Sequence, residues 1–287
     1  MTPLPSPRSL TMQRVLDGLR QLPSLPVVVL EVLETFEHAD VDVDALARRI
    51  AQDQAIAARV LRIANSSFYG LQTRVGTVQE AVVVLGFRSV RAMVVSVAAT
   101  NCFSPRACPG FDHAAFWRHC VGAALCARAL ARPARMNAEL AFTAGLLHDI
   151  GRLVLVTCFP DEYAATLAYG EQHDCPMLVA ERDVLGLDHA QVGEALAERW
   201  RFSPLLREAI GGHHAPQDYP ASSLAGLVHV ADLTARALDF ANVPNERVSP
   251  MSDVAWNRLG IGWTDFRAAL AEADTGFEEA CQIFLSH

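Results

Sequence analysis

The sequence has 287 residues, of which 51% are hydrophobic and 20% are charged, so it describes a chain with a substantial core and excludes a disordered protein. The formal net charge of −8 argues against a protein that binds nucleic acid mainly by neutralising phosphates. Lysine is absent, so arginine supplies the permanent side-chain positive charges.

The cysteines and the N-terminus indicate the compartment. The seven cysteines form no C-x-x-C pair and are odd in number, which is typical of reduced thiols and not of a disulfide framework. The first eight residues lack the apolar stretch of a signal peptide, and no charge-free apolar run reaches the roughly 18 residues of a membrane span. We therefore expect a cytoplasmic protein with no membrane partner.

The N-terminal part of the chain is predicted to be helical after a flexible leader at 1–21. Helices are expected at 27–36, from a cap at Asp44 to 50, and from a cap at Asp53 onward. Thr77 and Glu80 form a capping box that opens a further helix. The valine-rich runs 82–85 and 93–97 also have strand propensity, but the capping box and the adjoining alanines favour buried helices.

Residues 101–112, with two prolines, one glycine and two cysteines, mark the boundary between two helical units. We expect an N-terminal helical subdomain at 22–105 and a second unit at 106–287. Apolar periodicity in the second unit predicts helices at 116–131, 138–158, 161–173, 177–185, 189–200, 204–213, 222–240 and from 252 onward. The expected fold class is all-α, with the N-terminal subdomain packed on a C-terminal helical bundle.

The densest chemistry lies in residues 145–152, Gly-Leu-Leu-His-Asp-Ile-Gly-Arg. A carboxylate buried in so apolar a helix is costly unless a metal or a cation compensates it. Catalytic metal sites combine imidazole and carboxylate ligands on rigid elements and leave one coordination position open. The metal ligands expected here are His119, His148, Asp149 and Asp232, with His189, His213 and His214 as ligands of a second ion. The first four are predicted to meet in one cleft, with the second ion nearby.

Structural roles for these side chains remain open at this stage. A buried ion pair could account for His148 and Asp149, and the pair at 213 and 214 could cap the carbonyls of a helix end. Three other histidines, at positions 113, 173 and 229, are expected to be ordinary hydrogen-bonded residues.

Several longer phrases resemble a known family. The stretch GLLHDIGRLVL, FWRHC around His119 and HVADL around Asp232 resemble the HD superfamily of metal-dependent phosphohydrolases. More closely, the chain resembles the HDOD domain of bacterial signalling proteins, through LPSLPVVVLEVL, ARVLRIANSSFYG, TVQEAVVVLGFRSVR, GLDHAQVGEALAERW and the paired histidines. These phrases follow the family order over about two thirds of the chain.

The resemblance implies an HD-like helical bundle and a regulatory role exercised through signalling-protein partners. Family members commonly have degenerate metal ligands and no demonstrated hydrolase activity. A bound divalent metal (Fe, Mn, Mg, Zn or Ni) is compatible with this role. The N-terminal phrase places the expected partner-binding residues at Asn65, Ser66 and Tyr69.

The sequence also resembles the related HD-GYP cyclic-dinucleotide phosphodiesterases, because it keeps all seven histidine and aspartate positions in order. It departs from them at Arg152, where those enzymes carry a lysine, and in the short segment 215–221, where a longer Gly-Tyr-Pro-bearing loop would help to hold the dinucleotide. Arginine cannot act as a proton donor near neutral pH. If the protein is an enzyme, Asp149 and Arg152 are its catalytic candidates.

Three hypotheses follow. The first, which we favour, is a regulatory module with little or no hydrolase activity. The second is a metal-dependent phosphohydrolase acting on a nucleotide or a cyclic dinucleotide. The third, which the acidic composition disfavours, is nucleic-acid binding through the N-terminal arginines, which more often form a solvated face: Arg48, Arg49, Arg59, Arg62, Arg88 and Arg91.

Overall fold

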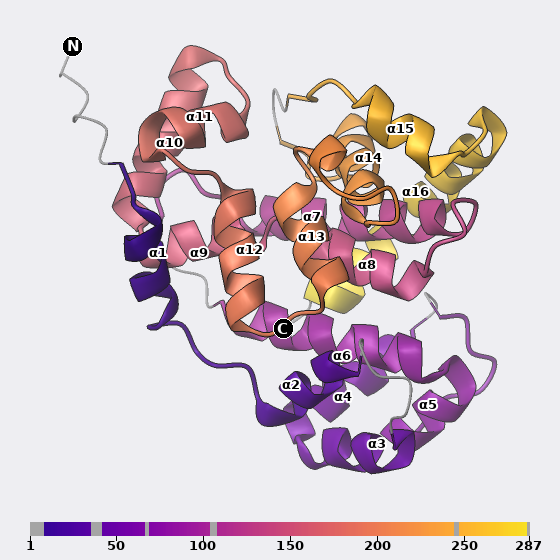
Figure 1. The fold of residues 1–287 in the computed structure, drawn as a ribbon. Helices are drawn as coiled ribbons and strands as arrows, with labels where there is room; N and C mark the ends of the chain where they lie inside the picture. The colour runs from indigo at the N-terminus through magenta and orange to yellow at the C-terminus, as the bar shows by residue number, and fades with distance from the viewer. Residues whose placement is uncertain (1–8, 36–41, 67–68, 104–107, 244–246, 286–287) are drawn as a thin grey trace.

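The computed structural model describes residues 9–35, 42–66, 69–103, 108–243 and 247–285. All regular elements in these ranges are helices, so the all-α prediction is confirmed. The helices form two groups that lie one above the other in Figure 1.

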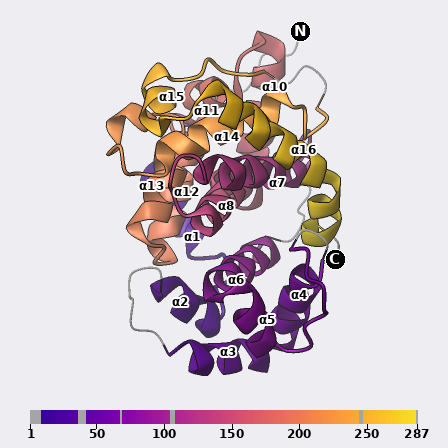
Figure 2. The same cartoon turned by 90° about the vertical axis from the view of Figure 1, so that its right-hand side faces the viewer.

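The N-terminal group contains five helices between residues 27 and 101. They are α2 (Val27–Glu34), α3 (Val43–Gln52), α4 (Gln54–Ala64), α5 (Val78–Leu85) and α6 (Phe87–Asn101). Helix α6 packs on α2, α4 and α5 within this group and on α8 of the other group, and its residues 89–99 are buried throughout. A helix that is apolar on all sides is expected only where it is covered on all sides, and α6 has this position between the two groups (Figure 2).

The C-terminal group is built around α7 (His113–Ala131), which packs against α8, α14 and α16. Its other elements are α8 (Ala138–Leu147), α9 (Ile150–Cys158), α10 (Pro160–His173), α11 (Met177–Leu185), α12 (His189–Arg199), α13 (Pro204–Gly212), the short 3-10 helix η1 (Pro216–Asp218), α14 (Ala225–Ala237), α15 (Asp253–Leu259) and α16 (Trp263–Leu285). Helix α16 also reaches α4, so the end of the described chain contacts both groups.

The leader predicted at 1–21 is wrong for its second half. Residues Met12–Leu19 form helix α1, which begins at a Thr11 side-chain cap and buries Val15 and Leu19 completely. Helix α1 packs on α9 and α12 of the C-terminal group (Figure 1). An isolated helix of eight residues is marginal in water, so its stability comes from this packing, which local sequence does not reveal.

The predicted helix starts are mostly correct. Asp53 caps α4 through its side chain, and Thr77 accepts the Glu80 amide at the start of α5. The cap predicted at Asp44 is two residues off, because Asp42 makes the capping hydrogen bond and Asp44 lies in the first turn of α3. Both valine-rich runs are helical, in α5 and α6.

The long helix predicted at 138–158 is divided at the His-Asp pair. Helix α8 ends at Leu147, α9 begins at Ile150, and the two residues between them form a turn. The turn changes the direction in which His148 and Asp149 point, which a continuous helix would not allow. The stretch Ala138–Cys158 is apolar enough for a membrane span by length and composition, but 94% of its most apolar window is buried inside the protein, so it is a core element.

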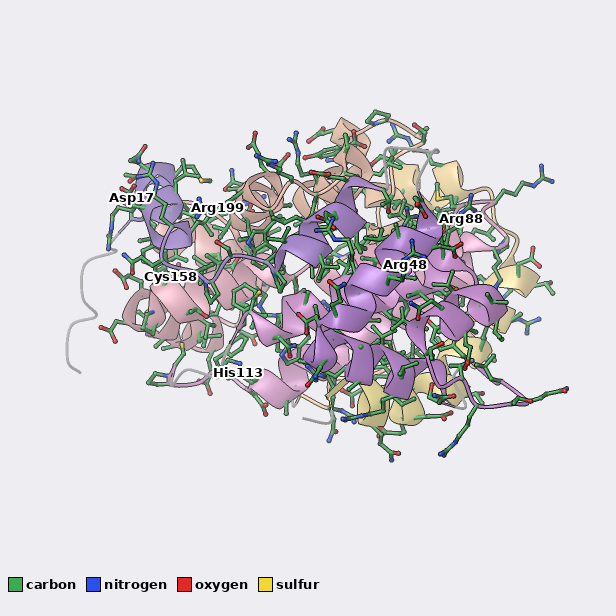
Figure 3. The ribbon with its side chains drawn as sticks, turned by 90° about the horizontal axis from the view of Figure 1, so that it is seen from below. Asp17, Arg48, Arg88, His113, Cys158 and Arg199 are labelled. Atoms are coloured by element: carbon green, nitrogen blue, oxygen red, sulfur yellow. The ribbon has the colours of Figure 1, made fainter. Side chains whose placement is uncertain are left out.

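The N-terminal arginines do not form one continuous solvated face. Arg48 and Arg88 are exposed on the N-terminal group (Figure 3), whereas Arg91 is buried and donates a hydrogen bond of 2.9 Å to the Thr35 carbonyl. Arg49 pairs with Glu31. Nucleic-acid binding through these arginines stays a hypothesis.

The residues expected to bind partners have roles inside the fold. The Asn65 side chain accepts the Val75 amide and donates to the Val75 carbonyl, both at 2.8 Å, and so fixes the segment between α4 and α5. Ser66 donates to the carbonyl of Ile63, and the Tyr69 ring stacks against Arg128 of α7 with 5.4 Å between the guanidinium carbon and the ring centroid. Partner binding at this surface therefore stays a prediction.

Candidate metal centre

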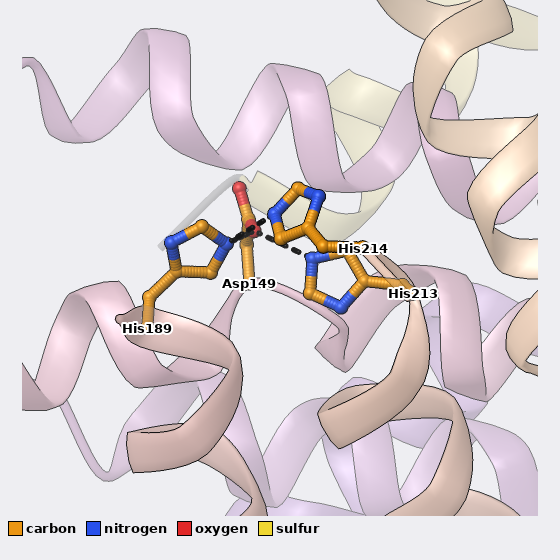
Figure 4. A group of neighbouring side chains, drawn as sticks. All are labelled: Asp149, His189, His213 and His214. Carbon is orange, nitrogen blue, oxygen red and sulfur yellow. Dashed lines mark hydrogen bonds and ion pairs between the residues drawn. The ribbon is translucent and has the colours of Figure 1, made fainter. Parts of the chain in front are cut away.

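The four side chains predicted to meet and the three predicted ligands of a second ion all come together in the C-terminal group. His119 lies in the middle of α7, and His148 with Asp149 forms the turn between α8 and α9. His189 opens α12, the pair at 213 and 214 follows the last turn of α13, and Asp232 lies on α14. Figure 4 shows four of the seven, Asp149 with three of the imidazoles.

Two glycines flank the turn and allow its helices to approach their neighbours. A Cβ atom at Gly145 would lie 2.7 Å from the Ala123 carbonyl of α7, and one at Gly151 would lie 1.9 Å from the His189 carbonyl of α12. Neither position can hold a larger residue without a backbone shift. The motif Gly-x-x-His-Asp-x-Gly thus places His148 against α7 and Asp149 against α12.

Asp149 is the centre of the constellation and is completely buried. Its Oδ1 atom faces three imidazoles, at 3.0 Å from His189 Nε2, 3.5 Å from His148 Nε2 and 3.7 Å from His213 Nε2. His214 Nε2 lies 2.9 Å from His189 Nε2. Four residues that could share one ion are therefore grouped here: Asp149, His189, His213 and His214.

Three of these imidazoles are oriented by acceptors on their far side. Nδ1 of His148 lies 2.7 Å from the Gly145 carbonyl, and Nδ1 of His213 lies 2.8 Å from the Ile210 carbonyl. Nδ1 of His189 lies 2.6 Å from Glu181 Oε2. An acceptor at Nδ1 fixes the proton there and turns the Nε2 lone pair inward, which is the usual arrangement around a metal ion.

The opposite side of the constellation is formed by His119, His148 and Asp232. His119 Nε2 lies 2.9 Å from Asp232 Oδ1 and 3.4 Å from His148 Nε2. Arg236, one helical turn after Asp232, donates from Nε to Asp232 Oδ1 at 2.9 Å. Its Nη2 atom lies 3.2 Å from His119 Nε2 and 3.7 Å from Asp149 Oδ2.

A second arginine supports Asp149 from α9. Arg152 Nη1 lies 3.2 Å from Asp149 Oδ2, and Arg152 Nε donates to the Tyr163 hydroxyl at 3.0 Å. That hydroxyl donates to Glu181 Oε1 at 3.0 Å, and the other Glu181 oxygen holds His189. A series of hydrogen bonds through Arg152, Tyr163 and Glu181 thus connects Asp149 to His189, the imidazole nearest to its Oδ1 atom.

The charges of the site follow from this geometry. Burial alone would raise the pKa of the Asp149 carboxyl, but the facing His148, His189 and Arg152 groups hold it well below its usual range. Burial lowers the pKa of His213 to about 3, with help from the neighbouring imidazoles. His119 has its pKa lowered to about 4, first by burial and then by Arg236. The pKa of His189 is shifted in the other direction: burial would lower it, but Glu181 and Asp149 outweigh burial and raise it to about 10.

The residues fit a divalent metal ion. Ligand atoms about 2.0–2.2 Å from one ion lie roughly 3–3.6 Å apart, and the contacts of Asp149 Oδ1 with His189 and His213 are 3.0 and 3.7 Å. Asp149 Oδ1 and His213 Nε2 are both buried, and neither makes a hydrogen bond within the described part of the chain. An ion between them would satisfy both atoms.

A cleft of about 740 Å³ opens onto this site. His119, His189, His214 and Asp232 line it, as do the guanidiniums of Arg152, Arg236 and Arg247. Phe111, Phe116, Leu167 and Met177 give it an apolar wall. The cleft has the size of a small-molecule site, and its charged lining combines the three arginines with four acidic residues, Asp112, Glu171, Asp174 and Asp232.

The sequence predicted which residues converge but grouped them differently. We expected Asp149 to act with His119, His148 and Asp232, whereas the shortest contacts join it to His189 and its neighbours. Three supporting residues were missed. Arg236 could have been found, because its i+4 spacing places it beside Asp232 on one helix face. Glu181 and Tyr163 have no such local signal. His229 is a buried, hydrogen-bonded residue as predicted, and its Nδ1 atom lies 2.7 Å from the His213 carbonyl.

Comparisons with known proteins agree with this architecture. A curated protein of Treponema pallidum (strain Nichols), whose function is uncharacterised, is 27% identical over 251 residues, which cover 85% of this chain and 48% of that protein. The chain thus spans about half the length of that relative.

Two solved structures extend the comparison. A candidate phosphohydrolase from Shewanella amazonensis SB2B is 30% identical and has a TM-score of 0.74, covering 95% of this chain and 97% of its own. A candidate signal transduction protein from Marinobacter aquaeolei VT8 has a TM-score of 0.79 at 20% identity, covering 96% of this chain and 66% of its own, and is similar in fold. The model of the HDOD domain matches residues 22–216, which is more than half of the sequence. The chain belongs to the HDOD family.

Proposed function

We propose that this chain is a metal-bearing regulatory protein of the HDOD family, which binds a phosphate-containing ligand in its cleft and acts through protein partners with little hydrolysis. The observation that carries the proposal is the convergence of three oriented imidazoles on Asp149 Oδ1, a buried oxygen without a hydrogen bond in the described structure. The nearest of the three imidazole atoms, His189 Nε2, lies 3.0 Å from this oxygen.

The cleft supports a phosphate-containing ligand. Guanidinium groups bind phosphate oxygens in a fork geometry, and Arg152, Arg236 and Arg247 line the cleft together with acidic residues. Its volume of about 740 Å³ could accommodate a nucleotide or a cyclic dinucleotide. A bound divalent ion would add positive charge at the end of the cleft where Asp149 lies.

The surroundings of Arg152 support low turnover. Hydrolysis of a phosphate ester needs a group that protonates the leaving oxygen. The HD-GYP phosphodiesterases, which the sequence resembles, carry a lysine at the position of Arg152. Burial would lower the pKa of Arg152, but Tyr163, Asp149 and Glu181 raise it well above its usual value. Arg152 can therefore hold Asp149 and a phosphate but cannot release a proton.

The N-terminal group supports partner binding. Its helix α5 exposes Val83 and Val84 at 84% and 56% of their surface. Such apolar exposure on neighbouring residues is a feature of interaction surfaces. Asn65, Ser66 and Tyr69 fix the segment that leads into this helix, so substitutions there would act on partner binding by displacing α5.

The second candidate function is a metal-dependent phosphohydrolase. It is favoured by the complete set of seven ligand-type side chains and by the 30% identity to a solved protein described as a candidate phosphohydrolase. In this alternative, Asp149 and the imidazoles would hold the ion, and Arg152 and Arg236 would neutralise the phosphate.

The two functions are separated by a combined binding and turnover measurement. Protein loaded with Mn²⁺, Fe²⁺ or Mg²⁺ is screened against nucleotides and cyclic dinucleotides by thermal shift and by product analysis. We expect stabilisation by at least one phosphate-containing ligand, with negligible product. Robust metal-dependent turnover that disappears in both His148→Ala and Asp149→Ala would establish the hydrolase instead.

A further inference from the structure

We propose that the constellation holds a single metal ion, in the set Asp149, His189, His213 and His214, and that the Arg236 guanidinium is a built-in cation that takes the place of a second ion beside His119 and Asp232. This inference rests on the metal-bearing function proposed above and specifies its stoichiometry.

Arg236 occupies the second position with a fixed geometry. Its Nε atom contacts Asp232 Oδ1 at 2.9 Å, the same oxygen that lies 2.9 Å from His119 Nε2 and 3.6 Å from His148 Nε2. Its Nη2 atom reaches His119 at 3.2 Å and Asp149 Oδ2 at 3.7 Å. One guanidinium therefore contacts three side chains that a second ion would need.

His119 differs from His148, His189 and His213 in a way that also disfavours an ion beside it. A neutral imidazole has one lone pair, and at Nε2 of His119 this lone pair either accepts from Arg236 or is replaced by a proton donated to Asp232. In both cases Nε2 is occupied. The Nδ1 atom of His119 is buried and has no hydrogen-bond partner among the described residues, unlike Nδ1 of His148, His189 and His213. The outer acceptor that orients a metal ligand is missing only here among these four.

Two buried ligand-type atoms without a hydrogen bond in the described part of the chain lie on the other side. Asp149 Oδ1 and His213 Nε2 make no hydrogen bond to described residues and belong to the four-residue set, whereas Asp149 Oδ2 faces Arg152 and Arg236. The two oxygens of one carboxylate thus have different surroundings, because Oδ1 faces the Nε2 atoms of imidazoles and Oδ2 faces two arginines. A metal ion on the Oδ1 side would meet ligand-type atoms, whereas an ion on the Oδ2 side would meet the permanent positive charge of Arg236.

This arrangement has a chemical consequence. In-line attack on phosphate in two-metal sites uses ions about 3.5–4 Å apart that bind the attacking and the leaving oxygen. A guanidinium supplies comparable positive charge and donates hydrogen bonds, but it offers no open coordination position for an oxygen. The protein would therefore bind a phosphate strongly between the ion and Arg236 without the second ion's contribution to hydrolysis.

The test is a count of bound ions. Metal-free protein is loaded with Mn²⁺, freed of excess ion and analysed for bound Mn²⁺ by elemental analysis, with electron paramagnetic resonance to separate isolated ions from coupled pairs. We expect one ion and an uncoupled signal in the wild type, and two ions with a coupled signal in Arg236→Gln. Arg132→Gln, which removes an exposed arginine paired with Glu272 outside the site, is expected to keep one ion.

Two further variants assign the ion to its set. His119→Gln should retain one ion, because the proposal places no ion at this residue, whereas His213→Gln should lose it. If Arg236→Gln does not fold, Arg236→Lys and the wild type still decide the question, since both should bind one ion.

The outcomes separate this inference from the proposed function. Two coupled ions in the wild type, one ion in folded Arg236→Gln, or loss of the ion in His119→Gln but not in His213→Gln would overturn the Arg236 assignment and leave the metal-bearing function standing. No ion in the wild type and none in Arg236→Gln would overturn both.

Discussion

The two helical groups of this protein differ in where they place charge. The C-terminal group buries aspartates, a glutamate and imidazoles around one cleft, and side chains from most of its helices meet there. The N-terminal group buries mainly apolar residues, with Arg91 as a hydrogen-bonded exception, and exposes valines on α5. A buried charge is stable only when it is compensated, so the polar centre constrains its group far more than an apolar core constrains the other. Substitutions should therefore have larger effects on stability near Asp149 than anywhere in the N-terminal group.

The largest effect is expected for Asp149→Asn. Removal of one partner from a buried charge network costs about 3–5 kcal/mol, and here it leaves two guanidiniums facing a neutral amide. The variant should also lose its bound ion, so a chelator should lower the melting temperature of the wild type but not that of the variant. Thermal melts with and without chelator measure both effects. Asp183→Asn, an exposed carboxylate that accepts from Tyr169, is the matched control and should melt like the wild type.

Equal melting curves for the wild type with and without chelator would contradict the metal-bearing function. The network around Asp149 would then be a structural ion-pair cluster. The two helical groups would differ only in their stabilising interactions, which are buried ion pairs in the C-terminal group and apolar packing in the N-terminal group.

The second largest loss of stability is expected for Gly151→Ala. The added Cβ would lie 1.9 Å from the His189 carbonyl, so α9 and α12 must separate. Overpacking of this kind costs about 1–3 kcal/mol, and the displaced His189 should also weaken metal affinity. Gly276→Ala in α16 is the matched control, because its Cβ meets nothing within 4 Å and alanine favours a helix by about 1 kcal/mol. Denaturant unfolding of both variants compares them, and similar stability would show that α9 is free to move.

These two positions also show what the sequence could predict. The convergence on Asp149 was predictable because an uncompensated carboxylate in an apolar stretch requires partners, and few other residues could supply them. The assignment of ligands to each ion was not predictable, because it depends on the turn at His148 and on the close approach at Gly151, which are both tertiary effects. Helix α1 was missed for the same reason, since its eight residues are stabilised by the surfaces of α9 and α12.

Local chemistry gave more reliable predictions. Asp53 and Thr77 cap their helices with side chains only a few residues from the amides they satisfy, so the signal lies within one turn of sequence. Glu181 and Tyr163 support the site from separate helices, and nothing in their own neighbourhoods distinguishes them from solvent-exposed residues. Both are completely buried in the fold.

An effect on stability alone, without the loss of metal affinity, is expected in the N-terminal group for Asn65→Ala. The substitution removes the two hydrogen bonds to the backbone of Val75 and leaves partly buried groups without their partner, at a cost of about 1–3 kcal/mol. Metal content should not change, because the site lies in the other group. Ser66→Ala is the control, since it loses only a hydrogen bond to Ile63 within the same turn. Denaturant unfolding and hydrogen exchange at the Val75 amide measure the difference, and equal exchange in the two variants would contradict the role of Asn65.

The smallest effect on stability, and the most selective effect on function, is expected for Val83→Glu. Val83 is 84% exposed on α5, so the charge should change the free energy of unfolding by less than about 0.5 kcal/mol. If the N-terminal group binds protein partners, the same charge should weaken that binding, because a charged group inside an apolar contact must be desolvated.

Val179→Glu on α11, where the valine is 41% exposed, is the matched substitution on the C-terminal group and should leave binding unchanged. Affinity capture with each folded variant from lysate of the source cells, quantified for proteins that the wild type retains, measures the contrast. Equal retention by both variants would remove α5 from the proposed interaction surface, and selective loss in Val179→Glu would move that surface to the group that carries the metal site.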